Sequence, residues 1–311
     1  MKKPQFIFPR RVVDGIILLD KPQGLSSNQA LQKVRNLFKA EKAGHTGSLD
    51  PLATGVLPIC LGEATKVAGL LLGNDKAYEA EATLGQTTDT DDSEGQVLVS
   101  RLIGVYSEQQ IHDVLQTLIG DIQQVPPIYS ALKQGGEPMY LKARRGEQID
   151  LPARTVRVDS IQLLSRTQTH LRLNAQCGTG TYIRSLVRDI GELLGCGAHV
   201  SALRRTWVEP FKEAKLWSLD ELNELALLGL DALDAQLMPV EAGLASLPKI
   251  LLSAEQAQKV GMGQKINVPI LNAACEWVQL CDDSQRCLGL ASIDAMGNLR
   301  VQRLFRWAAV S

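Results

Sequence analysis

Residues 44–55 read GHTGSLDPLATG, a segment in which residues capable of chemistry alternate with glycines. The three glycines permit unusual backbone dihedral angles and the close approach of another chain segment. Pro51 stiffens the chain directly after the carboxylate of Asp50. A phosphate-binding P-loop needs Gly-Lys followed by Ser or Thr, and an aspartic-protease site needs two aspartates, so neither motif matches. The pattern therefore indicates either a site built around Asp50 or an ordinary turn in which Asp50 caps a helix.

Strands and helices are interleaved around this segment, but not as clean repeats of strand, helix and strand. Residues 15–20 are an apolar run that ends in the turn signal KPQG, and Ser26 or Ser27 can cap the helix that follows. By hydrophobic periodicity we expect further strands at 56–61, 76–85, 154–164 and 170–176, and further helices at 64–72, 108–118 and 182–194. This order predicts an α+β fold rather than a doubly wound sheet.

The last part of the chain has a different pattern. After helix-rich residues 219–245 and the breaker Pro248, a short helix is expected at 254–260. Short strand-like runs separated by turn signals follow at 265–271, 276–280, 287–293 and 299–304. We therefore expect two domains, residues 1–249 and a small β-barrel of residues 250–311.

Composition excludes several classes of protein. The chain has 311 residues, of which 45% are hydrophobic and 22% charged, so a folded core is expected and disorder as the main state is not. The 33 basic and 34 acidic residues nearly cancel, which argues against a histone-like binder of nucleic acid. The charge is nevertheless uneven, because residues 1–66 and 125–190 are both basic and residues 75–95 are acidic. Solvated faces of either sign would explain these blocks equally well.

Neither a metal site nor a membrane segment is expected. The six cysteines include no C-x-x-C pair and the four histidines lie far apart, so no zinc or iron signature can be assembled. The longest early apolar run, residues 16–19, is too short for a signal peptide or a membrane span. We expect a cytoplasmic protein with reduced cysteines.

The segment 44–55 resembles the central motif of the TruB family of pseudouridine synthases, which isomerise uridine in the T-loop of tRNA. Further motifs of that family follow in order within residues 12–210. They read KPxG at 21–24, LGxxTDTxDxxG at 84–95, PPxxSAxK at 126–133 with Tyr140 and Ala143-Arg144 downstream, GxGTYIRS at 178–185 and GAHxxxLRR at 197–205. The bacterial type fits better than the guide-RNA-dependent relatives, because the chain is compact and lacks a basic tail. The resemblance implies a mixed, largely antiparallel sheet flanked by helices, followed by a PUA-like RNA-binding module.

The resemblance also implies the catalytic residues. Asp50 corresponds to the nucleophile of the family, although the sequence does not say whether it attacks the base or the sugar. Arg184 would lie against Asp50, and its charge would lower the pKa of that carboxylate. Tyr78 would stack on the target base and could take part in proton transfer. The alternatives are a surface arginine on an amphipathic helix and a tyrosine in a sheet.

Further residues are assigned to substrate binding by the same resemblance. Tyr182 and Leu203 would line the base pocket, and His45 would meet displaced nucleotides. Lys21, Lys66 and Asp92 fit RNA contacts and buried structural ion pairs equally well. Residues 125–153 resemble the RNA-gripping insertion of the family, and its candidates for phosphate contact are Lys133, Lys142, Arg144 and Arg145.

The function expected from these features is isomerisation of uridine to pseudouridine at position 55 of tRNA. The enzyme would flip the base out of the folded loop, cleave the glycosidic bond, rotate the base and join it again through carbon. The partner would be the T-arm stem-loop of tRNA, with no cofactor, no metal, no membrane and no obligatory protein partner, and the protein would be a monomer. One alternative is a catalytically silent tRNA-binding or tRNA-folding protein on the same scaffold. Another is a phosphate-binding metabolic enzyme built on the glycine-rich loop.

Overall fold

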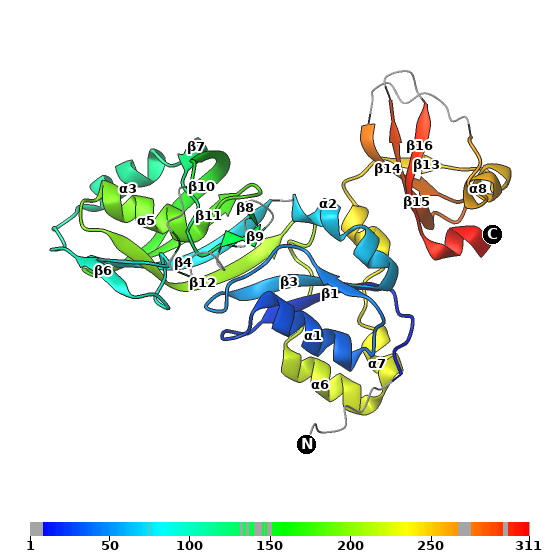
Figure 1. Cartoon of the computed structure of the whole chain (residues 1–311), viewed down its shortest axis with the longest axis horizontal. Helices are drawn as coiled ribbons and strands as arrows, with labels where there is room; N and C mark the ends of the chain where they lie inside the picture. The colour runs from blue at the N-terminus through cyan, green and yellow to red at the C-terminus, as the bar shows by residue number, and fades with distance from the viewer. Residues whose placement is uncertain are drawn as a thin grey trace.

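The computed structural model describes residues 9–73, 75–130, 133–134, 137–139, 145, 147, 151–266, 275–294 and 298–310. Figure 1 shows one large sheet with helices packed along it, and a smaller sheet of C-terminal strands that stands beside the larger unit. The described part of the chain contains no helix long and apolar enough to cross a membrane.

The large sheet has eight strands and carries the core. Its strand order is β1-β3-β12-β4-β11-β10-β7, and β2 pairs with β3 off this path. All neighbours in it are antiparallel except β12 and β3. The strands are β1 (Gly15–Lys21), β2 (Ala43–His45), β3 (Thr54–Leu61), β4 (Lys76–Leu84), β7 (Gly120–Gln124), β10 (Arg154–Arg166), β11 (His170–Cys177) and β12 (Ala198–Val208).

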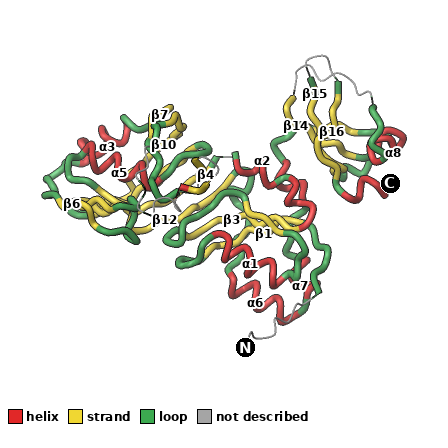
Figure 2. The backbone as a smooth tube through the Cα atoms, viewed as in Figure 1, coloured by secondary structure: helices red, strands yellow, loops and turns green. Residues whose placement is uncertain are grey.

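Helices cover this sheet in two groups. Helix α1 (Ser27–Leu37) packs on β3 and on α6 (Leu219–Leu228), whereas α5 (Ile183–Leu193) packs on β12 and β4 and contacts α3 (Glu108–Gln116). Figure 2 shows the two groups at opposite ends of the sheet. Helices α1, α3 and α6 each begin with a serine N-cap and a capping box. Short elements complete this unit: η1 (Gly62–Lys66), α2 (Ala68–Leu72), α7 (Leu230–Asp234) and η2 (Val240–Leu244).

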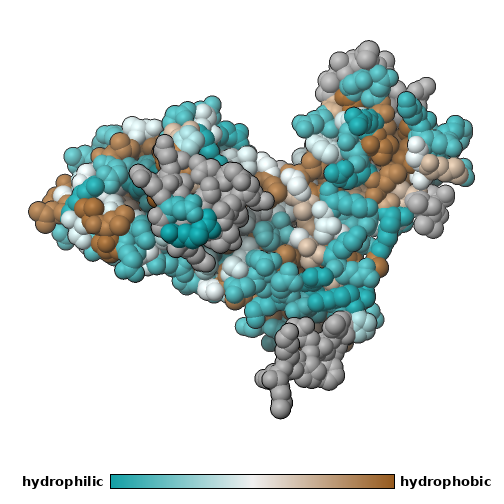
Figure 3. Space-filling model, in the orientation of Figure 1, coloured by the Kyte–Doolittle hydropathy of each residue, from teal (hydrophilic) through white to brown (hydrophobic). Residues whose placement is uncertain are grey.

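The C-terminal unit is a four-stranded sheet of order β13-β14-β15-β16. Its elements are β13 (Lys249–Leu251), α8 (Ala254–Gly261), β14 (Cys275–Cys281), β15 (Cys287–Ile293), β16 (Leu299–Leu304) and η3 (Arg306–Val310). Apolar residues of this sheet gather in Figure 3, whereas the surface over α1 and α6 is hydrophilic. The unit is joined to the large one by contacts of Gln279, whose amide donates to the carbonyls of Leu244 (2.9 Å) and Leu247 (3.0 Å). Phe305 packs in the same apolar cluster as Ile16.

The α+β fold with a mixed, largely antiparallel sheet is confirmed. The strands expected at 287–293 and 299–304 have the observed bounds, and the strands around 15–20, 56–61 and 76–85 differ by one or two residues. The helix expected at 64–72 is wrong, because the chain forms the short η1 and α2 instead. Four strands lacked an expectation: β12, β7, β5 (Gln86–Thr88) and β6 (Val97–Ser100). Short strands β8 (Lys133–Gln134) and β9 (Glu137–Pro138) lie in the insertion, and most of the run expected at 265–271 lies outside the described residues.

Candidate active site

The loop that ends in Gly55 sits where the sheet changes direction. Strands β3 and β12 run parallel over only two residue pairs, Arg204 with Thr54 and Arg205 with Gly55. Gly55 has φ +98°, and a Cβ atom there would lie 2.1 Å from the carbonyl oxygen of Arg205. Only glycine therefore permits this approach of the two backbones. The contact fixes the end of the loop and brings Asp50 beside the middle of the sheet.

Asp50 is held by a buried arginine. The guanidinium of Arg184, on α5, lies 3.0 Å from Oδ2 of Asp50, and the Arg184 side chain is only 5% exposed. Asp50 keeps 43% of its side-chain surface open, because it faces a cavity. A nucleophile needs this combination of a fixed position and an open face. The expected pairing of Asp50 with Arg184 is thus present.

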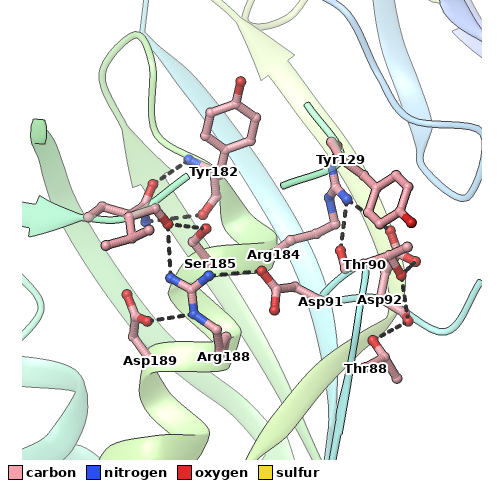
Figure 4. Close-up of polar contacts among 12 residues, drawn as sticks. Thr88, Thr90, Asp91, Asp92, Tyr129, Tyr182, Arg184, Ser185, Arg188 and Asp189 are labelled. Carbon is pink, nitrogen blue, oxygen red and sulfur yellow. Dashed lines mark hydrogen bonds and ion pairs between the residues drawn. The ribbon is translucent and has the colours of Figure 1, made fainter. Parts of the chain in front are cut away.

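Arg184 is fixed in turn by several partners, most of which Figure 4 shows. It donates to the carbonyls of Thr90 (2.8 Å) and Tyr129 (2.9 Å) and lies 3.3 Å from Oδ2 of Asp92. The carboxylate of Asp92 is 4% exposed and also accepts from the hydroxyl of Thr90 (2.6 Å). Asp92 is therefore part of the support that orients Arg184, which agrees with the buried ion pair among its two expected roles.

The pKa of Asp50 moves in the direction opposite to the one expected from the ion pair. Burial raises the pKa of Asp50 above its ordinary value, and the Arg184 charge opposes this rise without reversing it. The nearby carboxylate of Asp92 raises the pKa further. The expectation that Arg184 brings the pKa of Asp50 below its usual range is therefore wrong in its net sign. A carboxylate that is poorly solvated is also more reactive towards carbon.

Two cavities meet at Asp50. The first has a volume of about 590 Å³, and the residues lining it include Asp50, Lys76, Tyr78, Tyr182, Leu203 and Arg205. The second has a volume of about 630 Å³, and its lining includes Ser26, His45, Asp50, Thr90, Asp92 and Glu94. Arg184 and Ser130 line both. Volumes of this size hold a small ligand such as a nucleoside, so Asp50 can address a group bound in either cavity.

The wall of the first cavity carries buried cations next to a tyrosine. Tyr78, on β4, is 8% exposed and lies directly opposite Arg205 of β12, which is 1% exposed. Burial raises the pKa of Tyr78, and the charge and hydrogen bond of Arg205 oppose that rise. The side chain of Lys76, 7% exposed, belongs to the same wall, where burial and the Arg205 charge lower the pKa of Lys76. Tyr78 therefore enters any reaction as a neutral phenol.

Three family models match successive parts of the chain. They are "TruB family pseudouridylate synthase (N terminal domain)" over residues 35–183, "tRNA pseudouridylate synthase B C-terminal domain" over 184–245 and "Pseudouridine synthase II TruB, C-terminal" over 248–305. The tRNA pseudouridine synthase B of Xanthomonas campestris pv. campestris (strain 8004) is 55% identical over 303 residues, which are 97% of each chain. The chain belongs to the TruB family of pseudouridine synthases. The protein of the same name from Xylella fastidiosa (strain Temecula1 / ATCC 700964) is 51% identical over 95% of this chain and 97% of its own.

Solved structures agree with this family. A chain of "Crystal Structure of a Cbf5-Nop10-Gar1 Complex" superposes with a TM-score of 0.75 and 28% identity, covering 93% of this chain and 84% of that one. A chain of "Structure of H/ACA RNP bound to a substrate RNA containing 2'-deoxyuridine" has a TM-score of 0.73 and 26% identity, with 94% and 84% covered. The protein is thus an enzyme of the TruB family, and the reading as a phosphate-binding metabolic enzyme is wrong.

The remaining expected site residues divide into those near Asp50 and those elsewhere. Lys21 is fully buried and donates to the carbonyls of Pro22 (2.9 Å) and Leu25 (2.6 Å), and burial lowers its pKa to about 8. Asp50 lies close enough to oppose that fall in pKa. His45 lines the second cavity, and burial lowers its pKa as well, so the ring is neutral at neutral pH.

Lys66 does not belong to the pocket of this TruB enzyme. Its ammonium lies 2.6 Å from a carboxylate oxygen of Glu63 and donates to the carbonyl of Leu304 (2.7 Å) in the C-terminal sheet. Lys66 therefore ties the two units of the chain together, and its assignment to substrate binding is corrected. The sequence shows only that a lysine follows the strand, because the direction of its side chain depends on the unexpected η1 turn.

The basic residues of the insertion are described only in part. Arg145 lies 2.7 Å from a carboxylate oxygen of Glu147. The backbone of Lys133 lies in β8, whereas Lys142 and Arg144 lie outside the described residues. Their contacts with RNA stay predictions.

Three residues of the site had no predicted role. Arg205 and Lys76 line the first cavity, and Ser130 lines both cavities with a hydroxyl that is buried and has no hydrogen-bond partner in the described part of the chain. Ser130 and Arg205 lie in two of the motifs, which was the only signal available. Lys76 could not be found from the sequence, because a lysine at the start of a strand is ordinarily solvated.

Proposed function

We propose that this enzyme isomerises uridine to pseudouridine at position 55, in the T-loop of tRNA. The observation that carries the proposal is the open carboxylate of Asp50, held by the buried Arg184 at the meeting of two nucleoside-sized cavities. Its relatives are named tRNA pseudouridine synthase B, which supports tRNA as the substrate.

The first cavity suits the target base. Tyr78 and Tyr182 provide aromatic surface and Leu203 provides apolar surface, which together suit a flat ring that must be held while it turns. A uridine stacked in a folded loop cannot reach Asp50, so the enzyme must first flip it out of the stack. The cavity is open to the surface through the loop of Asp50, and a flipped nucleotide would enter there.

The chemistry needs one bond broken and one bond made to the same sugar carbon. The C1′–N1 bond breaks with its electron pair on the base, the base rotates, and C5 forms the new bond to C1′. The proton on C5 then leaves, and N1 gains a proton, so the product is an isomer of the substrate. Asp50 acts as the nucleophile in this proposal, either at the sugar carbon or at the ring. Neither a redox step nor a group donor is required.

The other site residues have supporting roles in the proposal. His45 meets nucleotides displaced from the loop in the second cavity, and Lys21 keeps its loop in place beside Asp50. Phosphates of the T-arm are contacted by the insertion of residues 125–153, which would order binding without reading sequence. We propose that residues 1–249 form the catalytic unit and residues 250–311 an RNA-binding module. The enzyme would work in the cytoplasm as a monomer, with no obligatory protein partner.

The direct test uses two RNAs and one control. Purified enzyme is incubated with an unmodified tRNA transcript and with the isolated T-arm stem-loop, and pseudouridine is mapped chemically at each position. A stem-loop with cytidine at the target position serves as the control. We expect one pseudouridine at the target in both uridine substrates. A reactive tRNA with an inert stem-loop would refute the recognition of the hairpin, and binding without any pseudouridine would support the silent RNA-binding protein instead.

A further inference from the structure

The most heavily buried charge of the enzyme is one that the proposed chemistry has not yet used. Arg205 is 1% exposed and is the largest fully buried side chain in the described part of the molecule. Its Nε donates to the carbonyl of Val56 (2.7 Å), and its terminal nitrogen donates to the carbonyl of Gly47 (3.3 Å). Both partners are neutral. Among the residues that the structure describes, no carboxylate forms an ion pair with Arg205.

The neighbouring arginine shows how different this is. Arg204 faces the other side of β12, and both terminal nitrogens lie 2.9 Å from the two carboxylate oxygens of Asp20. Removing a guanidinium from water without a counter-charge is unfavourable by several kcal/mol. The fold of the enzyme nevertheless keeps Arg205 in that condition, in the wall of the cavity that Asp50 faces. An uncompensated charge placed beside a reaction centre commonly serves to stabilise charge that develops there.

The location of Arg205 matches the place where negative charge would appear. It stands directly across the sheet from Tyr78, the residue that would stack on the target base, and it is close enough to favour the ionised form of that phenol. When the C1′–N1 bond breaks, its electron pair leaves with the ring, and the charge spreads over N1 and the two carbonyl oxygens. Attack of Asp50 on the ring would also place negative charge on a ring oxygen. Either route thus needs a cation near the base.

We propose that the guanidinium of Arg205 is a further catalytic group, which stabilises the negative charge that uracil carries between cleavage from C1′ and bond formation through C5. This inference rests on the proposed isomerisation of uridine. Arginine suits the role because it keeps its proton throughout the pH range of proteins. It can neutralise the ring without protonating it, so C5 retains the electron density that must attack C1′. A donor that gave up its proton would convert the detached base into neutral uracil, which is a poor nucleophile.

The first experiment compares substitutions at two adjacent arginines. Single-turnover rates at saturating enzyme are measured on the T-arm stem-loop for wild type, Arg205→Gln and Arg205→Lys, with Arg204→Gln as the matched control. Loss of one preorganised group at a developing anion typically lowers the rate by about 100-fold or more. We expect that loss in Arg205→Gln, a smaller loss in Arg205→Lys, and a rate within a few fold of wild type in Arg204→Gln. Equal rates in Arg205→Gln and wild type would overturn the inference.

The second experiment separates stabilisation of charge from support of the fold. Target uridine is replaced by 5-fluorouridine, whose ring holds negative charge more easily, and conversion is followed by nucleoside chromatography after digestion. If Arg205 stabilises the anion, the defect of Arg205→Lys relative to wild type is several-fold smaller with the fluorinated base. The same defect with both bases would mean that Arg205 only supports Gly47 and Val56, and would overturn the proposal even if Arg205→Gln does not fold. An inactive wild type would instead count against the proposed function.

Discussion

Replacement of Arg184 by methionine tests how Asp50 is kept in its reactive state. The side chains of Arg184 and Asp92 are 5% and 4% exposed, so the substitution leaves a buried carboxylate without its cation. Breaking a buried pair in this way costs about 3–5 kcal/mol. Asp92 retains its hydrogen bonds from the Thr90 hydroxyl and the Glu94 amide, which favours the lower end, about 3 kcal/mol. Chemical denaturation of the full chain measures this loss.

The same substitution has a second effect, on the pH dependence of the reaction. Burial already raises the pKa of Asp50, and Arg184 is the first influence that opposes it. Without Arg184 the pKa of Asp50 rises further, and the carboxylate is ionised only at higher pH. The acid limb of the single-turnover rate therefore moves to higher pH in Arg184→Met.

Two further variants separate these effects. In Arg184→Met/Asp92→Asn the stranded charge is gone, so we expect more than half of the lost stability to return while the rate stays low. Arg188→Met is the matched control, because Arg188 lies one turn further along α5 and pairs with Asp91 (2.9 Å) instead of Asp50. It should lose stability but keep the acid limb of wild type. An unchanged acid limb in Arg184→Met would refute the role assigned to Arg184.

Three other outcomes are expected. Because the folded pKa of Lys21 is about 8, the unfolded chain binds a proton that the native state lacks between about pH 8 and 10.4, so the stability of wild type should rise relative to Lys21→Met from pH 7 to 9.5, by at most about 2 kcal/mol; a constant difference would contradict this. Gly55→Ala should lose more than about 2 kcal/mol, since its Cβ meets the backbone of Arg205, whereas Gly24→Ala, also at positive φ but with open space around it, should lose only about 1 kcal/mol; equal losses in denaturation experiments would rule out the proposed clash. Alanine at the four basic positions of the insertion should flatten the dependence of log affinity on log salt by up to about three units, from the single-strand slope of about 0.7 per phosphate contact, and an unchanged slope would make the insertion a plain solvated loop; the positions are Lys133, Lys142, Arg144 and Arg145.

The parts of the fold that follow a simple periodicity were predictable from the sequence. Strand β15 and helix α1 have clear apolar patterns and turn or cap signals at their ends. Strand β12 was not recognised, although it is central to the sheet, because its segment AHVSALRRTWV places arginines where an alternating strand would show apolar residues. Those arginines face an ion pair on one side and the cavity on the other. A functional requirement thus obscured the structural pattern.

The site was predictable as a set of residues but not as an electrostatic arrangement. Motif spacing brought Asp50, Tyr78 and Arg184 together correctly. The sign of the shift in the pKa of Asp50 depends on how much protein surrounds the carboxylate, which the sequence does not contain. The misplacement of Lys66 has a similar cause, since its partner at Leu304 is 238 residues away.

The measurement closest to the central claim is the single-turnover isomerisation rate of Asp50→Asn at saturating enzyme, which removes RNA binding from the comparison. The amide has nearly the size of the carboxylate but lacks its charge and almost all of its nucleophilicity. We predict that conversion of the T-arm stem-loop falls below detection, while RNA affinity, supplied mainly by phosphate contacts, changes far less. A residual rate within about tenfold of wild type, equivalent to less than about 1.4 kcal/mol of barrier, would show that Asp50 only positions the base and is not the nucleophile.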